Sequence, residues 1–422
     1  MTHSSACAII TGYNESNPED GKVIGGSTTA RKRAVVLLGA GASIEYGAPC
    51  TTKLTSNIEA AVVADPWMQH NGSDAAYGKI KTALQSYLTK PSDVNFEHIY
   101  HCTHELIYAH APTRGAVNQY RPLMYPFFDN NTGLSKEAVR QLAQKMVAEI
   151  FSQISACCAA GSHDKTPLSN FISMLKTNYV TRMYTTNYDD FILQADNNLY
   201  VGFDRTAASP QRFDLNTFWH KQDEDSLFFM HGSVHMAFAH PPAADIGELF
   251  WFNDRDEALR HSTFSGSDES RMDGTGFLRS AIVTGLDKLS RLQVRPLSHF
   301  YSALAQDLMV ADVIFVIGSG LGDIHLNTWL HEARRRHPQP PLFFIDYWSA
   351  GFDTYNYATD YKTIEMLHKL RMMFGPYYPG SFNPAAHWTA AADRRCAVWD
   401  NGFQAFLKAT VDLQQVMRLL GL

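Results

Sequence analysis

The sequence predicts an α/β fold, a Rossmann-like parallel sheet flanked by helices. Five short runs of apolar, often β-branched residues are continuous rather than alternating, which is typical of strands buried on both faces. Their positions are 34–38, 181–186, 227–230, 312–317 and 341–345. Helical patterns lie between several of them, as at 277–292 and 299–310. Such alternation of strand and helix is the pattern of a parallel sheet.

The elements follow in order along one large domain, residues 31–350. Residues 1–30 are rich in Ser, Thr, Gly and Asn, and we expect them to form a flexible arm. Apolar residues recur at steps of three and four within 52–154, which predicts a helical insertion. Residues 241–273 are polar and irregular, and we interpret them as a loop or small insertion. Residues 351–422 are expected to form a helical C-terminal region.

The composition narrows the class of protein. The 36 basic and 42 acidic residues give a formal net charge of -6, without a long block of like charge, which argues against direct nucleic-acid binding. No apolar stretch is long enough to cross a bilayer, and the first residues do not resemble a signal peptide. The six cysteines contain no C-x-x-C pair, so no zinc ribbon is predicted. We expect a cytoplasmic protein that does not bind membranes.

All five apolar runs end in polar or glycine-rich residues. The endings are 39–43, 186–189, 231–233, 318–323 and Asp346. In an open parallel sheet, ligands bind in the crevice beyond the carboxyl ends of the strands. Five polar or glycine-rich strand endings on one edge of the sheet therefore predict one ligand pocket.

Two of these endings are glycine loops that suit a phosphate-containing ligand. Glycine lets the backbone approach a phosphate closely. The first loop lacks the dehydrogenase fingerprint, because Ile44 stands where G-x-G-x-x-G requires glycine, and a tight turn explains it equally well. Asp323 is expected to cap the following helix. Asp346 can accept hydrogen bonds from ribose hydroxyls, although a solvated strand end explains it equally well. The residues predicted to bind a dinucleotide are Gly39, Ala40, Gly41, Ser43, Thr186, Gly318, Ser319, Gly320 and Asp346.

The segment TTNYDD and a histidine supply the candidate reactive groups. Asn187 and Asp189 follow one strand, and His231 follows the next along the chain, opposite Asn187. Histidine at such a position is a candidate base. Taken alone, the segment is explained by an Asx turn, and Asp190 is expected to face solvent. No H-E-x-x-H spacing is present, so no metal is predicted. Histidines that can also lie near the pocket are His235, His240, His325 and His331.

These motifs, in this order, resemble those of the sirtuin superfamily. The resemblance spans 34–346 and includes GAGAS, TTNYD, the pair His231 and Gly232, and GSGLG. Two departures matter. The chain has no cysteine between Cys158 and Cys396, so it lacks the zinc module of deacylating sirtuins, and GAPCTTKL replaces their D-F-R segment. The segments TTNYDD and GSGLGDIHLN are more similar to the sirtuin-like NADases of bacterial antiphage defence.

The resemblance implies an NAD+ glycohydrolase with NAD as substrate and no metal. Such an enzyme releases nicotinamide and ADP-ribose and depletes cellular NAD+ during abortive infection. It implies a homo-oligomer activated by a partner, such as a HerA-like ATPase. Asn187 would bind a ribose hydroxyl or orient water, His231 would act as base, and Asp189 would support them. Two alternatives stay open: a sensor that binds NAD or ADP-ribose without turnover, and ADP-ribosyl transfer or deacylation, the latter disfavoured by the missing zinc module.

Overall fold

The computed structural model describes most of the chain outside the N-terminal arm. The expected arm 1–30, His240 and parts of the expected loop 241–273 lie outside the described residues. The described ranges are 31–109, 133–161, 163–239, 247–264, 278–286, 288–353, 361–368, 370–372 and 380–422.

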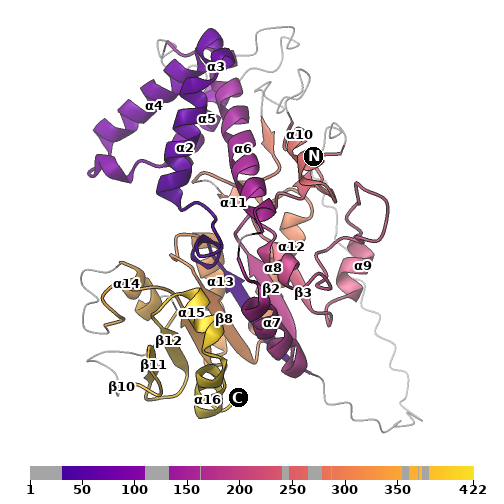
Figure 1. The fold of residues 1–422 in the computed structure, drawn as a ribbon, viewed down its shortest axis with the longest axis vertical. Coiled ribbons are helices and arrows are strands. Elements are labelled where there is room, and N and C mark those ends of the chain that lie inside the picture. The colour runs from indigo at the N-terminus through magenta and orange to yellow at the C-terminus, as the bar shows by residue number, and fades with distance from the viewer. Residues whose placement is uncertain are drawn as a thin grey trace, which may run out of the picture. The chain divides into compact units, whose positions relative to one another are not determined.

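The centre of the structure is an eight-stranded, mostly parallel sheet with the order β10-β11-β12-β9-β8-β1-β2-β3 (Figure 1). All five predicted strands are confirmed, and they lie side by side in parallel. They are β1 (Lys32–Leu38), β2 (Tyr179–Thr185), β3 (Ser226–Phe229), β8 (Val313–Ile317) and β9 (Leu342–Ile345). Every residue of β2, β3, β8 and β9 is buried, because helices cover both faces of the sheet. Their carboxyl ends therefore share one edge.

The C-terminal region corrects the expectation that 351–422 is helical. It contains the helices α14 (Tyr361–His368), α15 (Phe403–Lys408) and α16 (Thr410–Leu419), but also three strands. These are β10 (Ser381–Phe382), β11 (Trp388–Ala391) and β12 (Cys396–Trp399). β12 adds to β9 in parallel, and β11 and β10 follow antiparallel. Both β11 and β12 are only four residues long, which leaves little periodic signal, and two of the four residues of β11 are alanines, which favour strands weakly.

The predicted helical insertion is confirmed in its described part. Its helices are α2 (Thr51–Ala64), α3 (Pro66–Asn71), α4 (Ser73–Tyr87), the short 3₁₀ helix η1 (Pro91–Asp93), α5 (Phe96–Ala109) and α6 (Lys136–Ala159). The long helix α6 buries an apolar stripe and packs against α2, α4 and α5. Figure 1 shows α2 to α6 gathered beyond one end of the sheet. After the insertion, α7 (Thr166–Asn178) leads into β2.

The segment 277–292 corrects a second expectation, because its described part is mostly not helical. It contains β7 (Arg279–Ser280) and only one helical turn, α11 (Lys288–Arg291). The β-branched run 282–284 and Gly285, with a φ of +90°, disfavour a helix there. The backbone N–H of Val283 instead donates to the carbonyl of His231 at 2.8 Å. This segment therefore supports the end of β3.

The remaining elements connect these parts. Within the expected loop 241–273, residues 247–264 form β5 (Phe250–Trp251), α10 (Arg255–Arg260) and β6 (Thr263–Phe264). No helix among the described residues is long and apolar enough to span a membrane. The other elements are α1 (Gly41–Ile44), α8 (Phe191–Ala195), α9 (Leu215–His220), β4 (Met236–Ala237), α12 (Leu297–Met309) and α13 (Ile324–Arg336).

Candidate functional site

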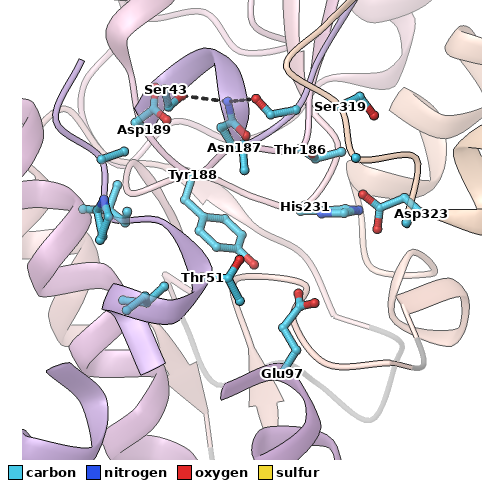
Figure 2. A pocket seen from close by; sticks show the side chains of 18 of the residues that line it. Ser43, Thr51, Glu97, Thr186, Asn187, Tyr188, Asp189, His231, Ser319 and Asp323 are labelled. Atoms are coloured by element: carbon cyan, nitrogen blue, oxygen red, sulfur yellow. Dashed lines mark hydrogen bonds between the residues drawn. The ribbon is translucent and has the colours of Figure 1, made fainter. Parts of the chain in front are cut away.

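A cavity of about 270 Å³ lies where the parallel strands end, facing the helical insertion (Figure 2). The segments that follow β1, β2, β3 and β8 form one side of it, and residues of α2, α5 and α6 contribute to the other. Four of the five predicted strand endings therefore meet around one space. The predicted site residues that line it are Gly39, Ala40, Ser43, Thr186, Asn187, Asp189, His231, Ser319 and Gly320.

Asp346, at the end of β9, is not among the residues that line the cavity. Its Oδ2 pairs with Nζ of Lys362 at 3.0 Å, and its Oδ1 accepts from the backbone N–H of Tyr347 at 2.8 Å. β8 separates β9 from β1 in the sheet. The fifth strand ending thus lies apart from the cavity formed by the other four.

Gly41 and Gly318 also do not line the cavity, because they join the two glycine loops to each other. The N–H of Gly41 donates to the carbonyl of Gly318 at 2.8 Å. Gly318 has a φ of +62°, and a Cβ there would lie 2.1 Å from the backbone nitrogen of Ala42. A Cβ at Gly320, in contrast, would meet no atom within 4 Å. Gly318 is therefore required for close backbone approach, whereas Gly320 faces open space.

The amide of Asn187 is held by the loop after β1. Its Nδ2 donates to the carbonyl oxygen of Gly39 at 2.9 Å and to Oγ of Ser43 at 2.7 Å. A carbonyl oxygen only accepts hydrogen bonds, so the contact with Gly39 fixes which end of the amide is nitrogen. Both N–H groups are used, and Oδ1 has no hydrogen-bond partner among the described residues, so it can accept a hydrogen bond from a ligand in the cavity. Figure 2 shows the two hydrogen bonds that hold this side chain.

Asp189 lines the cavity beside Ser43 and is buried. Burial raises the pKa of its carboxyl to about 6, and the negative charge of Asp190 acts in the same direction. Hydrogen bonds from Ser43 and from the backbone N–H of Phe191 oppose the shift without cancelling it. The carboxyl of Asp189 therefore titrates close to neutral pH.

Asp190 corrects the expectation that it faces solvent, since it is 6% exposed. Its Oδ2 contacts Nε2 of His235 at 3.0 Å and Nε of Arg255 at 3.8 Å, and its Oδ1 accepts from Nε2 of Gln194 at 2.6 Å. Burial alone would raise the pKa of Asp190, but His235, with smaller contributions from Cys158 and Arg255, outweighs it and holds the pKa at about 2. Asp190 therefore anchors the segment after β2.

His231 lies at the end of β3 and is 2% exposed. Burial lowers the pKa of its imidazole to about 3, although the charge of Asp323 acts in the opposite direction. The ring is therefore neutral at neutral pH, the form that accepts a proton or a hydrogen bond. Its Nε2 lies 3.1 Å from Nε2 of His325, which confirms that His325 is near the pocket.

The other histidines considered with it differ in position. His235 is buried, and its Nδ1 contacts the carbonyl of Phe252 at 2.9 Å while its Nε2 contacts Asp190. His331 is not among the residues that line the cavity. His325 alone joins His231 at the cavity edge among those the structure describes.

Two cavity residues that were not predicted, Glu97 and Lys288, form an ion cluster with Asp323 of the predicted ending 318–323. Nζ of Lys288 contacts Oδ1 of Asp323 at 2.8 Å and Oε1 of Glu97 at 3.1 Å. Asp323 makes no side-chain capping hydrogen bond to α13, contrary to the expected helix cap, because its carboxylate engages Lys288. Tyr188 also lines the cavity, and its hydroxyl donates to the carbonyl of Val283 at 2.9 Å. Glu97 and Lys288 are far apart in the sequence, and no local motif predicts that they contact each other.

Fold and site together define a Rossmann-like α/β protein whose ligand cavity lies at the carboxyl ends of its parallel strands. Residues 181–366 match the family model of the SIR2-like domain, over less than half of the chain. This segment contains the endings of β2, β3, β8 and β9, and leaves out the loop after β1.

The chain is also similar to solved structures of Sir2 homologues. A Sir2 homologue in complex with NAD is 12% identical, with 75% of this chain and 78% of that chain covered and a TM-score of 0.34. A variant of a Sir2 homologue in complex with ADP-ribose is 12% identical, with 81% of this chain and 91% of that chain covered and a TM-score of 0.35. The comparison with curated proteins found no match.

Proposed function

We propose that the chain is an NAD+ glycohydrolase, which cleaves NAD+ to nicotinamide and ADP-ribose. One observation carries the proposal: Asn187, with its amide fixed by Gly39 and Ser43, and a buried neutral His231 line the same cavity. The SIR2-like domain and the motif resemblance support NAD as the ligand. This arrangement suits a reaction that depends on positioning more than on strong acid catalysis.

The chemistry follows from the leaving group. Nicotinamide leaves as a neutral molecule when the bond between ribose C1′ and the ring nitrogen breaks, because the electron pair neutralises the pyridinium charge. Oδ1 of Asn187 would accept a hydrogen bond from a ribose hydroxyl or from the attacking water. The oxygen of that water bonds to C1′, and its proton passes to His231 and then to solvent. The products are nicotinamide, ADP-ribose and one proton.

Asp189 and the glycine loops would complete the site. The carboxylate form of Asp189 would stabilise positive charge that develops on the ribose in the transition state. Backbone groups around Gly39 and Ala40 and around Ser319 and Gly320 would contact the pyrophosphate, since small side chains permit close approach. Gly41 and Gly318 would act indirectly by joining these loops.

We also propose a biological role on the motif resemblance alone. The enzyme would deplete NAD+ in bacterial antiphage defence, as a cytoplasmic homo-oligomer activated by a partner such as a HerA-like ATPase. Adding such a partner to the purified chain and measuring NAD+ loss tests the activation. No gain in turnover with any candidate partner would argue against this role.

The direct test measures NAD+ loss and nicotinamide release by the parent, Asn187→Ala and His231→Ala. We expect turnover in the parent and a loss of at least about 100-fold in both variants, the usual size for a general base. His387→Ala is a matched control, because His387 is a half-exposed histidine paired with Asp400 and does not line the cavity. Circular dichroism and NAD binding show whether the variants are folded.

Other outcomes decide between the alternatives. Turnover that survives both substitutions would place the site elsewhere. With labelled NAD, label fixed to protein favours ADP-ribosyl transfer over hydrolysis. Binding without turnover, even with every candidate partner present, favours a sensor.

A further inference from the structure

Three potential metal ligands from two separate segments of the chain meet at the edge of the cavity. The donor atoms of His231, Asp323 and His325 all lie within 4.8 Å of one another. Figure 2 shows the ring of His231 directed at the carboxylate of Asp323. Because Asp323 and His325 stand at the start of α13 and His231 follows β3, the fold rather than local sequence creates this cluster.

The geometry of the two imidazoles is close to that of a metal-bound pair. Their Nε2 atoms are 3.1 Å apart. Two Zn–N bonds of about 2.0–2.1 Å that meet at a tetrahedral angle place the nitrogens about 3.3 Å apart. A shift of a few tenths of an ångström would therefore let one ion replace the proton that the rings share. Two histidines and one carboxylate with an open position is a frequent ligand set for transition metals.

The charges around the cluster allow a cation despite Lys288. Nζ of Lys288 contacts Oδ1 of Asp323, so Oδ2 of that carboxylate stays available. The same Nζ also contacts Glu97, which compensates its charge. With both imidazoles neutral, the side chains of Glu97, Asp323 and Lys288 have a net charge of minus one. The site is therefore not positively charged and does not repel a divalent cation.

The surroundings hold the ligands in place. His231 and His325 are 2% and 8% exposed, so their rings have little freedom to turn away. The hydroxyl of Tyr301 donates to the carbonyl of His325 at 3.1 Å, and Nδ2 of Asn327 donates to the carbonyl of Leu321 at 2.6 Å. These contacts fix the backbone of the loop after β8 and of the first turn of α13, which carry Asp323 and His325.

We propose that His231, Asp323 and His325 bind a divalent transition-metal ion of the Zn²⁺ class at the edge of the cavity. The ion takes Nε2 of both histidines and one oxygen of Asp323 and leaves a position for water. A bound ion removes His231 Nε2 as a proton acceptor, so the metal inhibits the enzyme. This consequence rests on the proposed function, whereas the binding itself does not.

The binding test uses the full chain, stripped of metal with a chelator that is then removed. Zn²⁺ affinity is measured by competition with a chromophoric chelator for the parent, His325→Ala, Asp323→Asn and His387→Ala. His387→Ala is the matched control, since it removes a histidine whose Nδ1 lies 3.0 Å from a carboxylate oxygen of Asp400 outside the cavity. We expect one tight site in the parent, unchanged in His387→Ala. The Zn²⁺ affinity should fall by about 100-fold or more in His325→Ala and in Asp323→Asn. Substitution of a residue that only hydrogen-bonds a metal ligand already lowers metal affinity about 10–100-fold.

A second readout guards against misfolding and against binding by cysteine. Co²⁺ bound to the parent should give visible bands of nitrogen and oxygen ligation without thiolate charge-transfer absorption, and His325→Gln should lose them. Equal Zn²⁺ affinity in the parent and His325→Ala, or a thiolate spectrum, would overturn the proposal. If the parent hydrolyses NAD+, Zn²⁺ should inhibit it and the chelator should restore it. Absence of hydrolysis would count against the proposed function and leave the binding result standing.

Discussion

Asp189 and Asp190 are neighbours in the chain and equally buried, at 6% exposure each, yet their surroundings differ. Asp190 faces His235 and Arg255, and its pKa lies at about 2. Asp189 faces Ser43 and the cavity, and its pKa lies at about 6. Burial pushes both pKa values upward, so the difference comes from the side chains of His235, Cys158 and Arg255, which act on Asp190 and lower its pKa.

The difference separates two roles for buried carboxyls. A carboxylate whose charge is matched stabilises the fold, whereas one without a matching cation carries a cost and is available to a ligand. Paired groups whose environments push their pKa values apart are typical of sites that handle protons. Four predictions test this contrast, from the largest expected effect to the smallest.

Asp190→Ala should cost the most stability. It leaves His235 and Arg255 without their buried partner, and breaking such a pair destabilises by about 3–5 kcal/mol. Denaturant unfolding at neutral pH measures the loss. Asp223→Ala is the control, since Asp223 pairs with Arg33 but its side chain is 90% exposed, and surface pairs contribute about 0–1 kcal/mol. Equal losses in the two variants would refute the role assigned to Asp190.

Asp190 should also make the protein sensitive to acid. Its folded pKa of about 2 is below the value of about 3.9 in unfolded chains, so its stabilisation is complete above about pH 4. It is lost as the pH falls towards 2, and one such shift corresponds to about 2–3 kcal/mol. Unfolding free energies from pH 6 to pH 2 test this. Asp190→Asn should show a shallower decline; an unchanged profile would count against the assignment.

Asp189→Asn should act in the opposite direction. The folded pKa of about 6 is above the unfolded value of about 3.9, so the parent loses stability as the pH rises from about 4 to 6. Asparagine keeps the size and avoids that penalty, so the variant should be about 1–3 kcal/mol more stable at pH 7. If the proposed function holds, NAD+ hydrolysis should fall about 100-fold, because the variant lacks the negative charge that would stabilise the transition state. If Asp189→Asn were less stable than the parent at pH 7, the buried charge of Asp189 would not be destabilising, and the contrast with Asp190 would be wrong.

Arg255→Gln should have the smallest effect. Nε of Arg255 is 3.8 Å from Asp190, and its side chain is 25% exposed, so solvent screens the pair. We expect a loss below about 1 kcal/mol and an acid profile like that of the parent. A loss as large as that of Asp190→Ala would mean that Arg255, not His235, is the main partner.

The sequence predicts the central strands and much of the cavity because local pattern determines them. Continuous apolar runs reveal β1, β2, β3, β8 and β9, and parallel pairing brings their polar endings to one edge. Asn187 and His231 were found in this way. Their roles in catalysis stay predictions until they are tested.

What the sequence did not predict depends on contacts between distant segments. Glu97 lies on an amphipathic helix and Lys288 at the start of the short helix α11, so neither position differs locally from a solvated surface charge. The partner of Asp190 is His235 on another loop, which is why Asp190 looked exposed. The four-residue strands β11 and β12 joined the sheet through pairing with other strands, β12 with β9 and β11 with β12.

The strand order limits where this chain can be cut for expression. β1 lies between β2 and β8, yet it precedes the segment 181–366 that matches the SIR2-like family model. A fragment with those boundaries would lack its middle strand, and two unpaired strand edges would be open to pairing with other chains. It would also contain Asn187 without the carbonyl and hydroxyl that hold its amide. A fragment that keeps β1 must therefore begin at or before residue 32, although the segment that matches the family model begins about 150 residues later.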